Sequence, residues 1–174
     1  SITMGLLTST RNKIIALILI TIIVFLGWQN GIEVFYARVV TFGSNVVLSA
    51  IKKDTSVEVE KVETTYQFKV RALIDNRKAS FPQAFGGILQ PFVIVLSWQL
   101  FLFLVLNRKS ALKSLLLNFG IFYLFHVIFL ILLTAYHSSE FQKFLYLLLM
   151  DSFYIIALVL VIKDNMLYPV FRKR

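Results

Sequence analysis

The chain contains no cysteine, only two histidines and only three prolines among its 174 residues. Without cysteine it can form no disulfide, no thiolate zinc site and no cysteine nucleophile. Two histidines are too few for the usual all-protein zinc site. The phosphate-binding glycine loop, the HExxH motif and the GxSxG motif are also missing from the sequence. We therefore expect no enzyme activity, no metal and no organic cofactor.

Acidic residues are scarce as well: nine Asp and Glu stand against 18 Lys and Arg, which gives a net charge of +9. Such an excess often indicates nucleic-acid binding. In this chain, however, the basic residues lie at the ends of long apolar runs, where they act as topology signals and contact lipid headgroups. We therefore expect these charges to meet the lipid bilayer and no nucleic acid.

Apolar sequence is abundant, since 58% of the residues are hydrophobic and the mean hydropathy is +0.78. A helix needs about 20 apolar residues to cross the ~30 Å hydrocarbon layer. Several runs approach that length, so the sequence predicts an integral membrane protein. No small-residue cleavage site follows the first run, and we expect it to be an uncleaved helix rather than a signal peptide. The four predicted spans are 13–28, Phe85–Leu106, Ser114–Ala135 and Phe144–Ile162.

The charge of the short loops predicts an orientation. The N-terminal flank, the loop 107–113 and the C-terminal tail are basic, whereas the loop 136–143 is nearly neutral. Because basic short loops stay in the cytoplasm, both termini are expected there and residues 31–84 are expected outside. This arrangement is typical of a multi-pass protein of a bacterial cytoplasmic (inner) membrane.

Residues 31–52 have the pattern of an amphipathic helix. Polar residues recur at three- or four-residue steps, and the apolar ones lie elsewhere on the helix. Two interpretations have equal weight: a separate helix at the membrane interface, or a plain continuation of the first span. The polar stripe is Arg38, Thr41, Asn45, Ser49 and Lys52, and the apolar residues are Phe35, Val39, Phe42, Val46 and Ile51.

The next stretch alternates with period two, which predicts strands. "VEVE" at 57–60 and "YQFKVRA" at 66–72 form a hairpin that turns near Glu63–Thr65, and residues 75–83 are expected to form a loop. The fold class is therefore an all-α membrane protein with a small β insert, divided into segments 1–30, 31–84 and 85–174. Because an unpaired strand edge invites a partner strand, we expect a partner to bind at Tyr66, Phe68, Lys69, Val70 and Arg71.

Two ionisable residues lie near the middle of predicted spans, where such groups are costly and often functional. His126 precedes the loop centre near Ser139 by about as many residues as Asp151 follows it, so both lie roughly 18–20 Å from the turn. They are therefore candidates for a pair, which Tyr123 and Tyr154 could join. Three readings remain open: a structural clamp between helices, a functional site such as a proton path, or no contact at all.

The layout resembles a known type of protein. A span ending at Trp28 leads to an amphipathic stretch, then to "VEVEKVE", then through "FPQAFGGILQPFVIVLSW" into closely spaced helices. This order is similar to that of the small membrane proteins that accompany bacterial exosortases, enzymes that process C-terminal sorting signals. Exosortases are thought to use Cys, Arg and His, so a chain without cysteine is not the enzyme on that model. The resemblance implies an accessory or binding partner.

The expected function is therefore that of a non-catalytic membrane accessory subunit that binds and stabilises a larger membrane protein complex, for example in protein sorting or export. Its partners would be other integral membrane proteins and the lipid bilayer. The alternative is a proton- or ion-coupled transport or motor component that uses His126 and Asp151. An intramembrane enzyme is a third option, which the missing nucleophile–base set disfavours.

Overall fold

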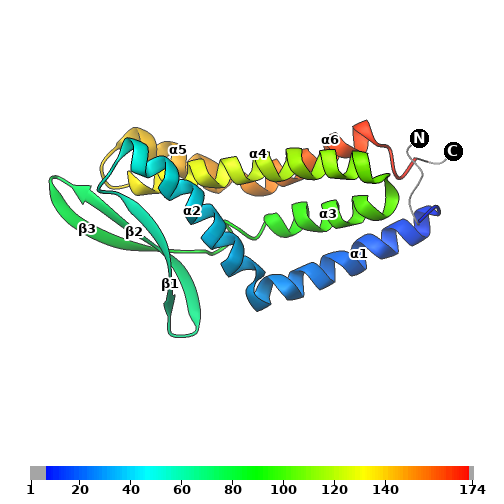
Figure 1. The fold of residues 1–174 in the computed structure, drawn as a ribbon, viewed down its shortest axis with the longest axis horizontal. Helices are drawn as coiled ribbons and strands as arrows, with labels where there is room; N and C mark the ends of the chain where they lie inside the picture. The colour runs from blue at the N-terminus through cyan, green and yellow to red at the C-terminus, as the bar shows by residue number, and fades with distance from the viewer. Residues whose placement is uncertain (1–6, 173–174) are drawn as a thin grey trace. The chain divides into compact units, whose positions relative to one another are not determined.

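The computed structural model describes residues 7–172 of the chain, most of which are helical (Figure 1). The chain forms two compact units. Unit 1 comprises Ser1–Asn30, Gln90–Phe122 and Tyr154–Arg174, and unit 2 comprises Gly31–Leu89 and Tyr123–Phe153. Both units are therefore assembled from separate stretches of sequence. In chain order the elements are α1 (Thr10–Gly27), the π-helical turn η1 (Trp28–Ile32), α2 (Glu33–Ile51), β1 (Ser56–Val62), β2 (Thr65–Ile74), β3 (Arg77–Ala84), α3 (Phe92–Val105), α4 (Arg108–Thr134), α5 (Glu140–Met150) and α6 (Phe153–Leu167).

The backbone stays helical from Thr10 to Ile51, through α1, η1 and α2. The continuation interpretation is therefore correct for the backbone. The side chains of α2 are nevertheless amphipathic, as predicted. Its apolar stripe is exposed, while Asn45 of the polar stripe hydrogen-bonds to Val57 of β1. The exposed large apolar residues of α2 are Phe35, Val39, Phe42, Val46, Val47 and Ile51.

Unit 2 contains a three-stranded antiparallel sheet in the order β1-β2-β3. The predicted strands β1 and β2 are confirmed, but the loop expected at 75–83 is wrong, because Arg77–Ala84 forms β3. The tight turn before β3 has positive φ at Asp75 (51°) and Asn76 (60°), the backbone that a two-residue hairpin turn requires. Pro82 is compatible with this strand because β3 lies at the edge of the sheet.

The predicted spans differ from the observed helices in three places. The second is much shorter than expected: α3 has 14 residues, about 21 Å of helix, and begins only after Pro91. The expected loop 107–113 is mostly the first turns of α4. The fourth predicted span is divided between two helices, α5 and α6, which are bent by 52° at a break after Met150. The described residues therefore hold two helices long and apolar enough to cross a membrane, or three if the bent pair is one span. The predicted count of four is not confirmed.

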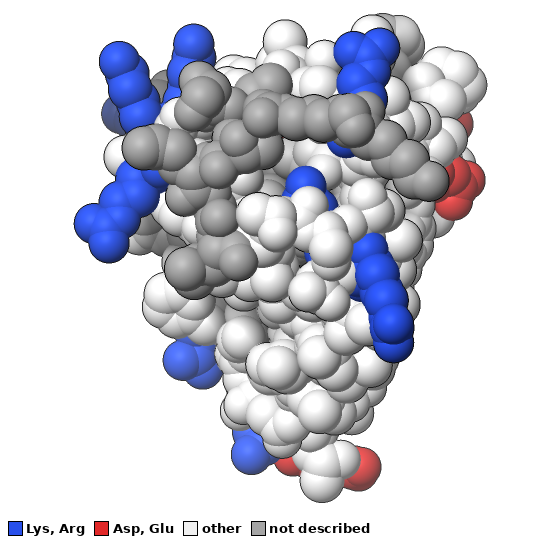
Figure 2. All heavy atoms as spheres, turned by 90° about the vertical axis from the view of Figure 1, so that its right-hand side faces the viewer, with Lys and Arg blue, Asp and Glu red and all other residues white. Residues whose placement is uncertain are grey.

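Basic side chains gather at the end of unit 1 where α1 begins and α6 ends. Figure 2 views this end and shows several Lys and Arg side chains around it, with few acidic ones. Arg11 lies in the first turn of α1, Lys109 and Lys113 lie in the first turns of α4, and Lys163 lies near the end of α6. These basic residues belong to the segments from which the orientation was predicted, and they lie at one end of unit 1.

Candidate functional site

Asp151 does not lie inside a continuous span. It caps the C-terminal end of α5, is exposed, and is followed by the turn that leads into α6. The apolar run 144–162 is therefore interrupted at this residue, and the continuous helix expected there is two helices, α5 and α6.

His126 is buried, with 1% of its surface exposed, and both of its ring nitrogens have partners in unit 2. Its Nε2 lies 3.0 Å from the carbonyl oxygen of Ile88. A carbonyl can only accept, so Nε2 carries the proton and Nδ1 accepts from the Tyr36 hydroxyl at 2.6 Å. The ring also stacks on Phe153, with centroids 4.3 Å apart. The observed pair is thus Tyr36–His126, and the predicted His126–Asp151 pair is replaced by it.

Depth along the helices predicted Asp151 as the partner, whereas the side chain that reaches His126 comes from α2. Tyr36 is 90 residues away in the sequence. The only sequence signal for it was its place opposite the exposed apolar stripe of α2. The two remaining residues of the predicted site have other surroundings or other hydrogen bonds. Tyr154 belongs to unit 1 and is 46% exposed, and Tyr123 donates from its hydroxyl to the carbonyl of Val39 at 2.8 Å.

Tyr123 approaches α2 so closely that position 43 must lack a side chain. A Cβ on Gly43 would overlap the Tyr123 hydroxyl and would lie 2.8 Å from its Cζ. Contacts under 3.0 Å force one of the two groups to move. The close approach of α2 and α4 therefore depends on this glycine.

Replacing Gly43 with alanine should lower the free energy of unfolding by about 1–3 kcal/mol, the usual cost of overpacking. The matched control is Gly120→Ala on α4, where a Cβ meets open space; it should not destabilise the chain and should gain up to about 1 kcal/mol, because alanine is the better helix former. Thermal unfolding of the purified chain in a mild detergent measures both. In a Tyr123→Ala background the Gly43→Ala cost should vanish; an unchanged cost there would contradict the proposed clash.

The sequence analysis missed a second polar cluster, in unit 1, whose centre is Asp164 on α6. The carboxylate is 1% exposed. Its Oδ2 accepts from Trp98 Nε1 on α3 at 2.9 Å, and from Ser114 Oγ and Asn118 Nδ2 on α4 at 2.8 and 2.6 Å. Lys163 adds a positive charge: its Nζ donates to Asn118 Oδ1 and lies 3.5 Å from Asp164 Oδ1.

The Asp164 cluster (Trp98, Ser114, Asn118, Lys163 and Asp164) joins α3, α4 and α6 through one carboxylate. Because the Lys163 ammonium already balances the buried carboxylate, the arrangement is complete as a structural anchor. Two features hid it from sequence reasoning. Residues 163 and 164 follow the last apolar run directly and were assigned to the tail, although α6 continues to Leu167. The i, i+4 spacing of Ser114 and Asn118 was a usable signal that these two share a helix face.

The predicted partner-binding residues divide between the two faces of the sheet, as the period-two pattern requires. Phe68 and Val70 are fully buried, and the ring of Phe68 lies 4.7 Å from that of Phe85. These two are core residues, so the expectation that they contact a partner is not supported by their burial. Lys69 and Arg71 lie on the opposite, polar face of β2. Tyr66 is half-buried beside Lys61, whose Nζ is 5.7 Å from the ring centroid.

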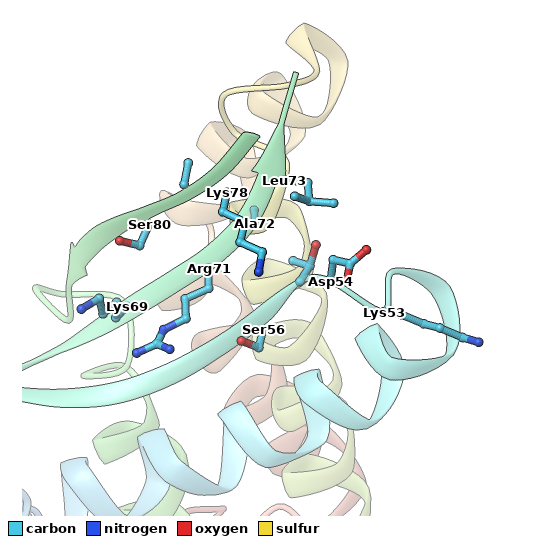
Figure 3. Close-up of a pocket in the computed structure, with 11 residues that line it drawn as sticks. Lys53, Asp54, Ser56, Lys69, Arg71, Ala72, Leu73, Lys78 and Ser80 are labelled. Carbon is cyan, nitrogen blue, oxygen red and sulfur yellow. The ribbon is translucent and has the colours of Figure 1, made fainter. Parts of the chain in front are cut away.

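The polar face of the sheet contains a hollow of about 580 Å³ (Figure 3). Arg71 lies in its middle, and the ammonium of Lys78 points into it, whereas Lys53 lies at its rim and points outward. Four basic residues and one acidic residue line the hollow. We call this space the basic hollow. Its lining residues are Lys53, Asp54, Thr55, Ser56, Lys69, Arg71, Ala72, Leu73, Lys78, Ala79 and Ser80.

Two glutamates of β1 already pair with two of these cations. Arg71 donates from Nη2 to Glu58 at 2.9 Å, and Lys69 lies 3.5 Å from Glu60. The Gln67 amide, which donates to Glu60 at 2.6 Å, and then the Lys69 ammonium lower the pKa of Glu60 from its ordinary value. Within residues 7–172, Lys53 and Lys78 have no acidic partner at ion-pair distance, so they contribute unbalanced positive charge.

The two edges of the sheet differ in what contacts their outward backbone groups. The Asn45 side chain of α2 accepts from the backbone N–H of Val57 at 2.9 Å and donates to its carbonyl at 2.8 Å, as a neighbouring strand would. This contact satisfies the outward backbone groups of β1 at Val57. No strand between residues 7 and 172 pairs with the outer edge of β3. Beside β3 lies a second hollow of about 360 Å³, lined by Phe81, Pro82, Gln83, Leu133, Tyr136, His137, Tyr146, Leu147 and Met150.

The described part of the chain contains no group of three or more His, Asp or Glu residues placed to hold a metal ion. Comparisons with protein-family models, curated proteins and solved structures found no match to this chain. The resemblance to exosortase-associated membrane proteins therefore stays a prediction from the layout.

Proposed function

We propose that this chain is a non-catalytic membrane subunit that binds another integral membrane protein through the open side of its sheet. The observation that carries the proposal is the asymmetry of the sheet. Its apolar face is buried and Asn45 bonds the outward backbone groups of Val57 on β1, while no strand within residues 7–172 pairs with β3 and the charged face lines an open hollow. An open strand edge binds extended segments through main-chain hydrogen bonds.

Two further features support a partner in the same membrane. The chain has two or three helices apolar enough to span a bilayer, and a protein held in a bilayer meets other membrane proteins by diffusion in its plane. Proteins normally blunt an edge strand with charge, proline or a covering element to prevent unwanted pairing. Here Asn45 covers β1 at Val57. The edge strand β3 carries charge at Arg77 and Lys78 and a proline at Pro82, but no strand pairs with it among residues 7–172, and its first five residues precede that proline. The exosortase-type layout implies the same kind of accessory role.

The alternative of a proton- or ion-coupled component has no specific observation in its favour. It depended on His126 and Asp151 as a pair. His126 is held by Tyr36 and Ile88, and Asp151 is exposed at the end of α5. The subunit proposal therefore stands alone.

Photo-crosslinking in the native membrane tests the proposal. A photoreactive residue at Ala79 or Ser80, on the open part of β3, should give a discrete adduct with one larger membrane protein. The same residue at the turn position Glu63 serves as the matched control, because it is equally accessible but lies at the far end of β2. Gentle purification followed by mass spectrometry should identify the same larger protein in constant ratio.

Adducts from Phe42 on the exposed α2 stripe, with none from Ala79 or Ser80, would contradict the sheet as the binding surface. Equal adducts from Glu63 and from β3 would mean that the crosslinks report only collision. A chain that purifies alone from native membranes in mild detergent, with no crosslinked partner, would overturn the subunit function itself.

A further inference from the structure

The basic hollow has a regular spacing of charge along β2. Lys69 and Arg71 lie two residues apart on the same face, and Lys78 is the cross-strand partner of Leu73, the next residue on that face. The positive charges therefore occupy three successive levels of the sheet. Residues two apart in a strand are about 6.6–6.8 Å apart, so the three levels form a row with this repeat.

The chain itself contains the complement of this row. On β1, Glu58 and Glu60 are also two residues apart, and they pair with Arg71 and Lys69 respectively. The opposite side of the row has no acidic residue: Ser80 of β3 pairs with Arg71 and Pro82 pairs with Lys69. Lys69 and Arg71 thus each have an acid on the β1 side and none on the β3 side.

The cations retain binding capacity toward β3. A guanidinium has five N–H groups, and Arg71 uses one terminal nitrogen for Glu58, with its side chain 59% exposed. Lys78 has no acidic partner among the described residues. The hydroxyls of Ser56 and Ser80, directly across from Arg71 on both sides, can also donate to an oxyanion.

We propose that the basic hollow binds an extended acidic peptide segment whose carboxylates alternate along the chain. An extended strand repeats its side chains on one face at the same spacing as the row of cations, so successive carboxylates can meet Lys69, Arg71 and Lys78. The proposal rests on the proposed function, because the segment would belong to the bound membrane partner. It adds the chemistry of that partner: acidic, extended and lying along the open side of β3.

A lipid headgroup fits the hollow less well than a peptide. A phospholipid offers one phosphate and needs apolar contacts for its acyl chains, whereas the hollow has cations at three levels. Leu73 is the single large apolar side chain among its lining residues. The charge pattern therefore favours several evenly spaced carboxylates over one phosphate.

The test uses the full chain purified in a neutral detergent and a dye-labelled peptide in which glutamate alternates with threonine, followed by fluorescence anisotropy. The alternating peptide should bind more tightly than the same peptide with glutamine, and more tightly than one with its glutamates in a single block. Lys78→Ala and Arg71→Gln should each weaken binding about fivefold, as removal of an exposed ion pair does. Arg77→Ala, next to Lys78 but outside the hollow, is the matched control and should leave binding unchanged.

Equal binding of the glutamine peptide would overturn the proposal, and so would an Arg77→Ala loss as large as the Lys78→Ala loss. Full displacement of the peptide by phosphatidylglycerol vesicles would show that the hollow binds a lipid headgroup instead. Displacement by inorganic phosphate at the peptide's own concentration would likewise assign it to a free anion. The proposed function can fail separately. If the chain binds the alternating peptide but gives no crosslink and no co-purifying protein, the peptide site is supported and the subunit function is contradicted.

Discussion

Replacing Asp164 with alanine should lower the free energy of unfolding of the detergent-solubilised chain by about 3 kcal/mol. The change removes the common acceptor of Trp98, Ser114 and Asn118. Side-chain hydrogen bonds in membrane proteins contribute about 0.6 kcal/mol each on average, whereas breaking a buried ion pair costs 3–5 kcal/mol. Because the side chain of Lys163 is 28% exposed and can turn outward, the loss should fall between these limits.

Two further variants separate charge from shape. Asp164→Asn keeps one acceptor oxygen and nearly the same volume, so it should lose about half as much as Asp164→Ala. Asp151→Asn is the matched control, because this exposed aspartate ends α5 and accepts no buried donor among the described contacts; it should stay within about 0.5 kcal/mol of the wild type. Unfolding in mixed micelles with increasing SDS measures the three free energies.

A second readout follows the contact directly. The indole N–H resonance of Trp98 should shift in Asp164→Ala and should not move in Asp151→Asn. A wild-type midpoint for Asp164→Ala, or an equal loss in both aspartate variants, would contradict the role assigned to the Asp164 cluster.

These two aspartates show where reasoning from the sequence succeeds and where it stops. Apolar runs predicted the helical character of the chain, because burial or lipid contact of a long run requires a helix. They could not predict the break at Asp151 and Ser152, since neither glycine nor proline marks it. The helix α6 continues past Asp164 to Leu167. The sequence had placed these residues in the tail, because Lys163 and Asp164 are charged. Which aspartate is buried depends on the end of α6, and element ends are set by tertiary contacts.

The sheet was partly predictable for a similar reason. Alternation identified β1 and β2, and it placed Phe68 and Lys69 on opposite faces, as observed. The third strand was hidden by its composition, since Arg77, Lys78 and Pro82 are all typical of loops or edges. The Asp75–Asn76 pair, which has the left-handed backbone of a tight hairpin turn, was the local signal that a strand follows.

The partner of His126 could not be predicted because sequence spacing sets the depth of a side chain along its helix but not the direction in which it points. Asp151 lies at a comparable distance from the α4–α5 turn, yet Tyr36 of α2 makes the contact. Contacts between distant segments are the information that a single sequence does not carry.

His126→Ala should be as costly as the Asp164 change or more so, with an expected loss of about 3–5 kcal/mol. Truncating a large buried ring leaves a cavity, which costs several kcal/mol, and it also leaves the Tyr36 hydroxyl and the Ile88 carbonyl without their partner. His126→Phe should recover a large part of this loss, because it keeps the stacking on Phe153. The control is His137→Ala, the other histidine, which is exposed.

The double-mutant cycle of Tyr36→Phe and His126→Phe then isolates the hydrogen bond. Its coupling should be about 0.5–2 kcal/mol, the range for contacting polar pairs, and Asp151→Asn combined with His126→Phe should be additive. Coupling to Asp151 instead of Tyr36 would restore the pair expected from depth and would contradict the observed geometry. Coupling to Tyr36 together with additivity at Asp151 would mean that His126 joins α2 to α4 within unit 2, so this ring and the Tyr123–Val39 contact together set the position of α2 and of Asn45 beside β1.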